Sequence, residues 1–289
     1  MKLAGRIALV TGAGQGLGAE IARQYVINGA SVVLCGRSAE KLEAQKLNLT
    51  PLLAPDARIV ISAVDVAEPR QVDATFARLR SEFPRLDIVV NNAGVYGPMG
   101  NIEDIDWEEW VDALRINLLG LVYVSRAAIP IMRAQRHGKI INVSGGGAAN
   151  PMPMISAYAA SKAGVVRFTE SLALECLDDH IDVNAIAPGA LRTQMMDQLL
   201  KAGPEKVGAQ FYDRMKRIAE EGGTPLSLGA ALCVFLGSPD SDGITGKLIA
   251  AQWDRWEDWP QHLDELNASD VYTLRRITGR DRDKKWGDR

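Results

Sequence analysis

Short apolar segments alternate with longer amphipathic segments along this chain, and this alternation limits the fold more than any other feature. Seven segments are candidate strands, and most of them have a nearly unbroken core of Val, Ile, Leu and Ala: 6–12, 31–36, 57–65, 86–94, 138–144, 181–189 and 247–251. Unbroken apolar runs of this length are typical of strands that are buried on both faces of a parallel sheet. Helical patterns lie between them, at 18–30, 69–83, 107–132, 156–176 and 226–238. The alternation predicts an α/β fold, a doubly wound parallel sheet of about seven strands with helices on both faces.

The composition favours a globular enzyme-like or binding domain and excludes several other classes. Hydrophobic residues make up 47% and charged residues 24% of the 289 residues, as expected for a soluble protein with a full core. The net charge of −3 gives no reason to expect nucleic acid or an anionic membrane as a partner. No apolar run approaches the roughly 20 residues of a membrane helix. Cys35, Cys176 and Cys233 are far apart and form no metal motif, which is consistent with a reducing, cytoplasmic location.

The strand pattern divides the chain into one domain, 1–251, and a C-terminal extension, 252–289. Residues 190–225 interrupt the pattern with Met-rich helical segments that contain glycine breaks. They are interpreted as a substrate lid, with a surface helical insertion as the alternative. The extension contains four of the six tryptophans, Trp253, Trp256, Trp259 and Trp286. Because no strand pattern continues into it, the extension is expected to pack on the outside of the domain or on another subunit.

A glycine-rich turn follows the first strand and begins the first helix. Gly12, Gly14, Gly16 and Gly18 allow a tight turn and a close backbone approach to a pyrophosphate at a helix N-terminus. Glycines alone are weak evidence, because simple strand–helix turns also use them. Their position after a buried N-terminal strand strengthens the interpretation as a Rossmann-like dinucleotide site.

The end of the second strand bears on the choice of cofactor. An acidic residue about 20 residues beyond the glycine turn would bind the ribose hydroxyls of NAD. Gly36 stands at that position and Arg37 follows it. An arginine can bind a 2′-phosphate through two hydrogen bonds, although a solvated loop charge is the simpler interpretation. We therefore favour NADP(H) over NAD(H), while Gln15 lies in the turn where a second basic residue would strengthen this preference.

Tyr158 and Lys162 are separated by one helical turn and therefore share a helix face. A free tyrosine titrates near pH 10, about three units above neutrality, and is then a poor acid–base group. The ammonium of Lys162, with the positive charge of an oxidised nicotinamide, would favour the phenolate and lower the pKa of Tyr158. The alternative is a partly buried helix whose lysine extends to solvent.

Taken together, the motifs resemble the short-chain dehydrogenase/reductase family, in its shorter single-domain form. The matching segments are TGAGQGLG (11–18), NNAG (91–94), INLLG (116–120), YAASK (158–162) and APG (187–189). The resemblance covers 6–251. It implies catalysis by Tyr158, Lys162, Asn117 and a serine. Asn117 binds a water that passes protons to the lysine. Cofactor contacts are implied for Gly12, Gln15, Gly16, Leu17, Gly18, Arg37, Asp65, Val66, Asn92, Ala93, Gly94, Tyr158, Lys162, Pro188, Gly189 and Thr193.

The serine is where this sequence departs from the family pattern. Counted from the tyrosine or from the strand, the usual position holds Gly145, and Ser144 is one residue early. Three interpretations remain open. The glycine-rich loop shifts so that Ser144 serves; the site works without it, aided by Ser156 or a backbone N–H; or the protein binds cofactor with little turnover.

The resemblance implies an NADP-dependent oxidoreductase that interconverts a carbonyl and a secondary alcohol, with Tyr158 as general acid and base. The alternative function is a catalytically weak dinucleotide-binding protein that senses redox state or acts as a scaffold. The partner expected in the first case is a small-molecule carbonyl or alcohol. The family also implies a homotetramer or homodimer, built partly on the helices that begin at Trp107 and Ser156. We expect the extension to cover part of the substrate entrance or a subunit interface.

Overall fold

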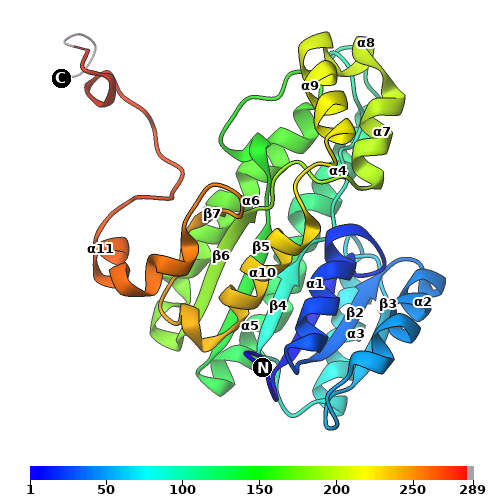
Figure 1. The fold of residues 1–289 in the computed structure, drawn as a ribbon, viewed down its shortest axis with the longest axis vertical. Helices are drawn as coiled ribbons and strands as arrows, with labels where there is room; N and C mark the ends of the chain where they lie inside the picture. The colour runs from blue at the N-terminus through cyan, green and yellow to red at the C-terminus, as the bar shows by residue number, and fades with distance from the viewer. Residues whose placement is uncertain (285–289) are drawn as a thin grey trace.

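Seven parallel strands form one sheet in the order β3-β2-β1-β4-β5-β6-β7 in the computed structural model, which describes residues 1–284 (Figure 1). The strands are β1 (Ile7–Thr11), β2 (Ser31–Gly36), β3 (Ile59–Ala63), β4 (Ile88–Asn91), β5 (Gly138–Val143), β6 (Ile181–Ala187) and β7 (Leu248–Ala250). Each lies within one of the seven apolar segments of the sequence. The predicted doubly wound parallel sheet is therefore confirmed.

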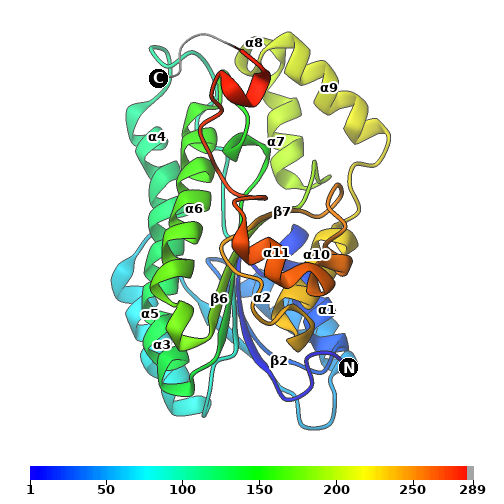
Figure 2. The same ribbon diagram turned by 90° about the vertical axis from the view of Figure 1, so that its left-hand side faces the viewer.

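Helices connect the strands and cover both faces of the sheet (Figure 2). They are α1 (Gly16–Ile27), α2 (Ala39–Leu49), α3 (Pro69–Glu82), α4 (Trp107–Leu114), α5 (Gly120–Gln135), α6 (Ser156–Glu175), α7 (Gln194–Ala202), α8 (Pro204–Val207), α9 (Ala209–Glu220), α10 (Leu226–Gly237) and α11 (Leu263–Ala268). Helix α2 lies where the apolar pattern marks no helix. Only Leu42 and Leu49 of α2 are buried, so it has no continuous apolar stripe for the sequence to display.

Successive strand residues point to opposite faces, and both faces are apolar. Val10 and Leu34 belong to the core cluster beneath α1 and α10, whereas Leu9 and Val33 belong to the cluster beneath α3 and α5. Since β1 pairs with β2 in the register Leu9↔Val33 and Val10↔Leu34, neighbouring strands present matching residues to each face. Burial on both faces explains why the strand segments are unbroken rather than alternating.

The longest helical run joins α4 and α5 through one π-helical turn, Arg115–Leu119. By length and composition alone, Trp107–Gln135 could cross a membrane. In this fold α5 instead lies on the sheet through residues that include Leu121, Val124, Ala128 and Met132, as a core helix does.

The strand order places a topological switch between β1 and β4. The chain adds β2 and β3 on one side of β1, then returns to add β4 on its other side. In open α/β sheets, ligands bind in the crevice at the carboxyl ends of the strands at such a switch. At the opposite, amino edge, the fully buried carboxylate of Asp87 accepts hydrogen bonds from Ile7 N at 2.9 Å, Arg6 Nη1 at 2.9 Å and Arg85.

The C-terminal extension begins on the domain and then leaves it. Trp256 and Trp259 are buried in the cluster beneath α10, with the rings of Trp256 and Phe235 5.1 Å apart. The buried ammonium of Lys247 donates to the carbonyls of three residues of the extension, Leu266, Ser269 and Val271. Leu274 N and the guanidinium of Arg275 still contact Glu170 on α6, and the red end of the chain then stands away from the body (Figure 1). Trp286 lies outside the described residues.

Candidate active site

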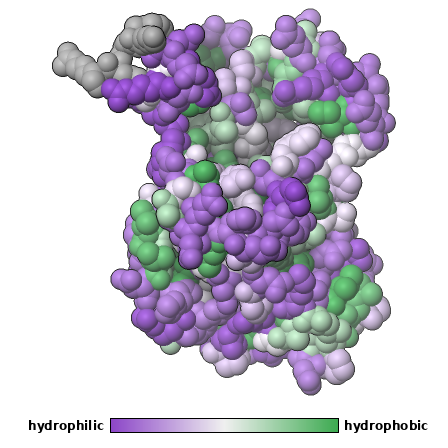
Figure 3. All heavy atoms as spheres, turned by 60° about the vertical axis from the view of Figure 1, so that its left-hand side comes forward, coloured by the Kyte–Doolittle hydropathy of each residue, from purple (hydrophilic) through white to green (hydrophobic). Residues whose placement is uncertain are grey.

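A cavity of about 1790 Å³ lies at the carboxyl ends of the strands, between the sheet and helices α7 to α9. Figure 3 shows this end of the molecule hollowed, with apolar and intermediate residues inside the hollow and hydrophilic residues around it. Ser144 and all residues for which the family resemblance implies a catalytic or cofactor role line the cavity, except Gly18 and Asn117. The topology therefore brings segments from residue 12 to residue 193 to one place.

The glycine turn is built for close backbone packing. Gly12 has φ +65°, and a Cβ on Gly18 would lie 2.3 Å from the carbonyl oxygen of Gly12. Gly18 thus packs α1 against the turn instead of lining the cavity. No side chain caps the start of α1 at Gln15. The N–H groups of the first turn of α1, which includes the cavity-lining Gly16 and Leu17, are thus available to an anion such as a pyrophosphate.

Thr11 fixes the NNAG segment beside this turn, a role that the sequence did not reveal. Its hydroxyl oxygen accepts hydrogen bonds from Asn92 N at 2.9 Å and Ala93 N at 3.0 Å. The side chain of Asn92 donates in return to the carbonyl of Thr11 at 2.9 Å. The ends of β1 and β4 are therefore held together at the topological switch.

The far end of the cavity carries two cations. Arg37 follows Gly36, as the sequence indicates, and Lys41 lies one turn into α2 and also lines the cavity. The ammonium of Lys41 donates to the side chain of Gln15, whose amide donates to Gln194 Oε1 at 2.8 Å. Lys41 was missed from the sequence because α2 itself was not marked.

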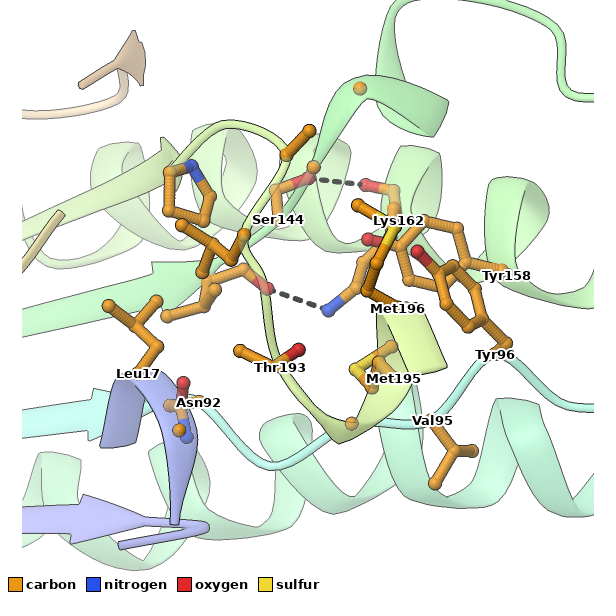
Figure 4. A pocket seen from close by; sticks show the side chains of 18 of the residues that line it. Leu17, Asn92, Val95, Tyr96, Ser144, Tyr158, Lys162, Thr193, Met195 and Met196 are labelled. Atoms are coloured by element: carbon orange, nitrogen blue, oxygen red, sulfur yellow. Dashed lines mark hydrogen bonds between the residues drawn. The ribbon is translucent and has the colours of Figure 1, made fainter. Parts of the chain in front are cut away.

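Tyr158 lies on the first turn of α6 and lines the cavity beside Tyr96, with the two ring centroids 4.9 Å apart (Figure 4). Burial raises the pKa of Tyr158 above its ordinary value of 10.0, and the neighbouring Tyr96 raises it further. Within the protein itself, the expected lowering of this pKa is therefore absent. Tyr96 is a second aromatic group of the site that the sequence did not single out.

Lys162 is buried, and its ammonium donates to the carbonyl oxygen of Val143 at 2.7 Å (Figure 4). It lies 5.7 Å from the centroid of the Tyr158 ring. Burial lowers the pKa of Lys162 from 10.5 to about 8. The predicted pair is thus brought together, and its lysine exchanges a proton much closer to neutrality than an ordinary lysine does.

Asn117 lies in the π-helical turn and is almost fully buried. Its Oδ1 accepts from Val95 N at 2.8 Å, and its Nδ2 donates to Val95 O at 2.8 Å and Ser161 Oγ at 3.0 Å. Every polar atom of the amide is therefore satisfied, as a buried amide requires. Ser161 in turn donates to the carbonyl of Tyr158, so Asn117 and Ser161 connect the cavity-lining residues Val95 and Tyr158 without lining the cavity themselves.

The two serines considered as the third group point elsewhere. Ser144 Oγ donates to the carbonyl oxygen of Lys162 at 3.2 Å, although the residue borders the cavity (Figure 4). Ser156 Oγ accepts from the indole N–H of Trp110 at 3.1 Å and does not line the cavity. Gly145 does line it, and its position is where the usual serine would stand.

The segment 190–225 contributes a wall of the cavity that Tyr158 and Lys162 also line. Thr193 lies over the glycine turn, since a Cβ on Gly16 would be 3.4 Å from Thr193 Cγ2. Helices α7, α8 and α9 have a small core of their own, which includes Met196 and Met215. From the extension, the exposed ring of Trp253 borders the cavity as well.

Comparison with known proteins assigns the chain to a family. The short chain dehydrogenase family model matches residues 6–203. The chain belongs to the short chain dehydrogenase family. It resembles the Escherichia coli strain K12 protein "Oxidoreductase UcpA", with 36% identity over 256 residues, which covers 85% of this chain and 92% of UcpA.

Comparison with solved structures supports the assignment of the chain to this family. The structure of NAD+-bound xylitol dehydrogenase superimposes with a TM-score of 0.79 at 25% identity, covering 86% of this chain and 98% of that one. The structure of L-sorbose reductase from Gluconobacter frateurii, complexed with NADPH and L-sorbose, gives 0.77 at 30% identity, covering 86% and 97%. The relatives are oxidoreductases, dehydrogenases and reductases, so the chain is an enzyme of the oxidoreductase type.

Proposed function

We propose that the protein is an NADP(H)-dependent oxidoreductase that interconverts a carbonyl and a secondary alcohol, with Tyr158 as general acid and base. One observation carries the proposal. The hydroxyl of Tyr158 and the ammonium of Lys162 share a cavity with the uncapped N-terminus of α1. A proton donor, a cation and a phosphate-binding turn in one cavity fit hydride chemistry on a nicotinamide dinucleotide.

We infer that a dinucleotide would lie along this cavity. The first turn of α1 would hold the pyrophosphate, Asp65 and Val66 the adenine, and Lys162 the nicotinamide ribose. NNAG, Pro188, Gly189 and Thr193 would complete the walls. Arg37 and Lys41 together favour the 2′-phosphate, because two cations replace the acid that would bind ribose hydroxyls. Similar structures hold NADPH in one case and NAD+ in another, so the preference rests on these two side chains.

The residues of the chain then divide the reaction between them. When bound, the nicotinamide supplies or accepts the hydride. Tyr158 gives its proton to the carbonyl oxygen, and its raised pKa keeps the hydroxyl protonated beforehand. The ammonium of Lys162 stabilises the phenolate that forms. With a pKa of about 8, Lys162 also returns a proton readily near neutral pH, and Asn117 holds the neighbouring backbone in place.

For the third group we favour the backbone N–H groups of the glycine-rich turn after β5. Both side-chain candidates are engaged, Ser144 with Lys162 O and Ser156 with Trp110. Gly145 and Gly146 line the cavity and carry no side chain to block approach to their N–H groups. Fixed N–H donors are effective stabilisers of developing negative charge on oxygen.

The segment 190–225 is proposed as the substrate lid, and the chain as a cytoplasmic homo-oligomer. The lid borders the cavity with residues of α7 and α9, among them Met196 and Phe211. Three buried thiols favour a reducing compartment. Exposed apolar side chains on α4 and α6, Trp107 at 63% and Leu174 at 77%, favour burial against another subunit. Light scattering coupled to size-exclusion chromatography measures the oligomeric state.

The decisive experiment separates the enzyme from a cofactor-binding protein with little catalysis. NADPH binding is measured by tryptophan fluorescence, and turnover is measured on a broad carbonyl and alcohol panel. Tyr158→Phe should retain NADPH binding and abolish turnover. Binding by the wild-type protein without turnover on any member of the panel would favour the sensing or scaffolding alternative.

A further inference from the structure

The charges around the cavity are strongly unequal, although the whole chain has a net charge of −3. The cavity is lined by one carboxylate, Asp65, and by five cations: Arg37, Lys41, Lys162, Arg192 and Arg214. Arg37 and Lys41 suit cofactor phosphates, and Lys162 serves the reaction. Two arginines at the lid end therefore have no role in the proposed function.

Arg192 has a structural partner within the lid. Its Nη1 donates to the carbonyl oxygen of Ala219 at 3.0 Å, near the end of α9. The guanidinium therefore adds a hydrogen bond to a carbonyl at a helix C-terminus that already accepts from Gly222 N at 3.3 Å. This contact ties the start of the lid to its last helix. Of the two lid-end arginines, only Arg214 then lacks a structural role.

Arg214 lies on the cavity side of α9, a face that is mostly apolar apart from Arg214 and Gln210. Phe211, Met215 and Ile218 line the cavity from the same face, at the spacing of one helical turn. The guanidinium carbon lies 5.3 Å from the centroid of the Phe211 ring. Within residues 1–284 no ion pair joins Arg214 to a carboxylate, whereas Arg133 and Arg167 each have one. A cation in such surroundings is available to an anion that enters the cavity.

Most of the side chains that the catalytic segment and the lid contribute to the cavity are apolar and adaptable. They include Tyr96, Met152, Met195, Met196, Phe211 and Met215, with Asn150, Gln194 and Gln210 as polar exceptions. Methionines fill irregular space and accept varied apolar shapes. A ligand that reaches from Tyr158 to Arg214 must therefore be largely apolar in its middle.

We propose that the substrate is an apolar ketone or secondary alcohol that carries a carboxylate remote from the reacting carbon, and that Arg214 binds this carboxylate. The position of the reacting carbon rests on the proposed function of Tyr158. A carboxylate suits the site better than a phosphate monoester, because a single guanidinium matches one negative charge and binds a carboxylate through two parallel hydrogen bonds.

The test uses a homologous series of methyl ketones that end in a carboxylate, each with its methyl ester as a neutral partner. With NADPH, the wild-type enzyme should reduce at least one acid with a kcat/KM roughly tenfold above that of its ester. The difference should appear in KM. Arg214→Gln should remove it, and should leave the KM for NADPH unchanged. Arg217→Gln is the matched control, since it removes the same charge from α9 at a position that does not line the cavity.

A binding measurement keeps this inference separate from the proposed function. Calorimetry on Tyr158→Phe loaded with NADPH should show acid bound more tightly than ester, and the double variant with Arg214→Gln should lose the preference. That result supports the carboxylate site even if the wild-type enzyme turns over none of the ketones. Equal affinity for acid and ester, a preference that survives Arg214→Gln, or no binding of any acid would overturn the inference.

Discussion

A Cβ atom on Gly145 would lie 2.5 Å from the hydroxyl oxygen of Tyr158. Any side chain at position 145 would therefore compete with the Tyr158 hydroxyl for the same space. The departure from the family pattern at Gly145 is thus coupled to where the tyrosine sits.

Gly145→Ala should displace the Tyr158 hydroxyl and lower kcat by roughly 100-fold, as a misplacement of about 1 Å can do. NADPH affinity should change little. Gly146→Ala is the control, because a Cβ on Gly146 meets no atom within 4 Å. Steady-state kinetics on both variants make the comparison. Unchanged kcat in Gly145→Ala would show that Tyr158 tolerates the shift or does not act.

Ser144→Ala should leave kcat close to the wild-type value. Its hydroxyl donates to the carbonyl of Lys162, so the loss of this hydrogen bond should lower the free energy of unfolding by about 1 kcal/mol. Kinetics and urea unfolding measure the two effects. A rate loss as large as that of Tyr158→Phe would instead establish Ser144 as the third catalytic group.

Lys162→Met should stabilise the protein at pH 7 while abolishing turnover. The pKa of Lys162 is about 8 in the folded protein, against an ordinary value of 10.5. Below pH 8 the lysine is charged in both states, and the fold bears the full cost of burying the ammonium, roughly 3 kcal/mol. As pH rises from 8 to 10.5, the folded lysine loses its proton first and this cost disappears.

The stability advantage of Lys162→Met should therefore shrink as pH rises through that range. Thermal unfolding without cofactor, at pH 7 and at pH 10, measures the difference in Tm between variant and wild type. Lys46→Met, on α2 and outside the cavity, provides a control for the loss of a lysine charge. A constant difference across this range would contradict the lowered pKa.

Lys41→Ala should weaken NADPH binding by roughly fivefold and leave NADH binding unchanged. The 2′-phosphate is the part of the cofactor that NADH lacks, and an exposed ion pair contributes up to about 1 kcal/mol. Lys46→Ala, farther along α2, should affect neither cofactor. Fluorescence titration of the wild type and both variants with each cofactor gives the six dissociation constants. Equal weakening for both cofactors would place Lys41 away from the 2′-phosphate.

Two tryptophans of the extension should behave in opposite ways. Trp256→Ala should lower the free energy of unfolding by about 3 kcal/mol or more, because a buried ring leaves a cavity. Trp253 is 77% exposed and borders the cavity, so Trp253→Ala should change the substrate KM and leave unfolding unchanged. Denaturant unfolding and kinetics on both variants test this. A lower free energy of unfolding in Trp253→Ala would contradict the assignment of Trp253 to the cavity and not to the core.

Much of this architecture could be predicted because burial on both sheet faces leaves a strong record in the sequence. All seven strands appear as apolar segments, and parallel strands necessarily bring their carboxyl ends to one edge. Motifs such as Gly12, Asn92 and Tyr158, which follow or lie near those ends, could therefore be assigned to one site before any coordinates. The roles expected for individual residues came from the family resemblance, and the strand order was seen only in the structure.

What escaped prediction depends on side-chain direction and on weakly patterned segments. Helix α2 buries only two residues, so neither it nor Lys41 could be placed. The hydroxyl of Ser144 turns towards the helix backbone, a rotamer choice that spacing does not encode. The raised pKa of Tyr158 also follows from burial beside Tyr96, which lies 62 positions earlier in the chain and meets it only in the fold.

The sheet separates two kinds of residue along its length. The side chains proposed for catalysis and cofactor binding lie at the carboxyl edge, while Asp87 and its arginines tie strands together at the amino edge. Evolution or a designer can thus change residues 190–225, including Arg214, while the anchoring end continues to hold the fold. Because Asp87 lies at the opposite edge of the sheet from the cavity, substitutions there should not change substrate specificity. They should instead lower the stability of the fold.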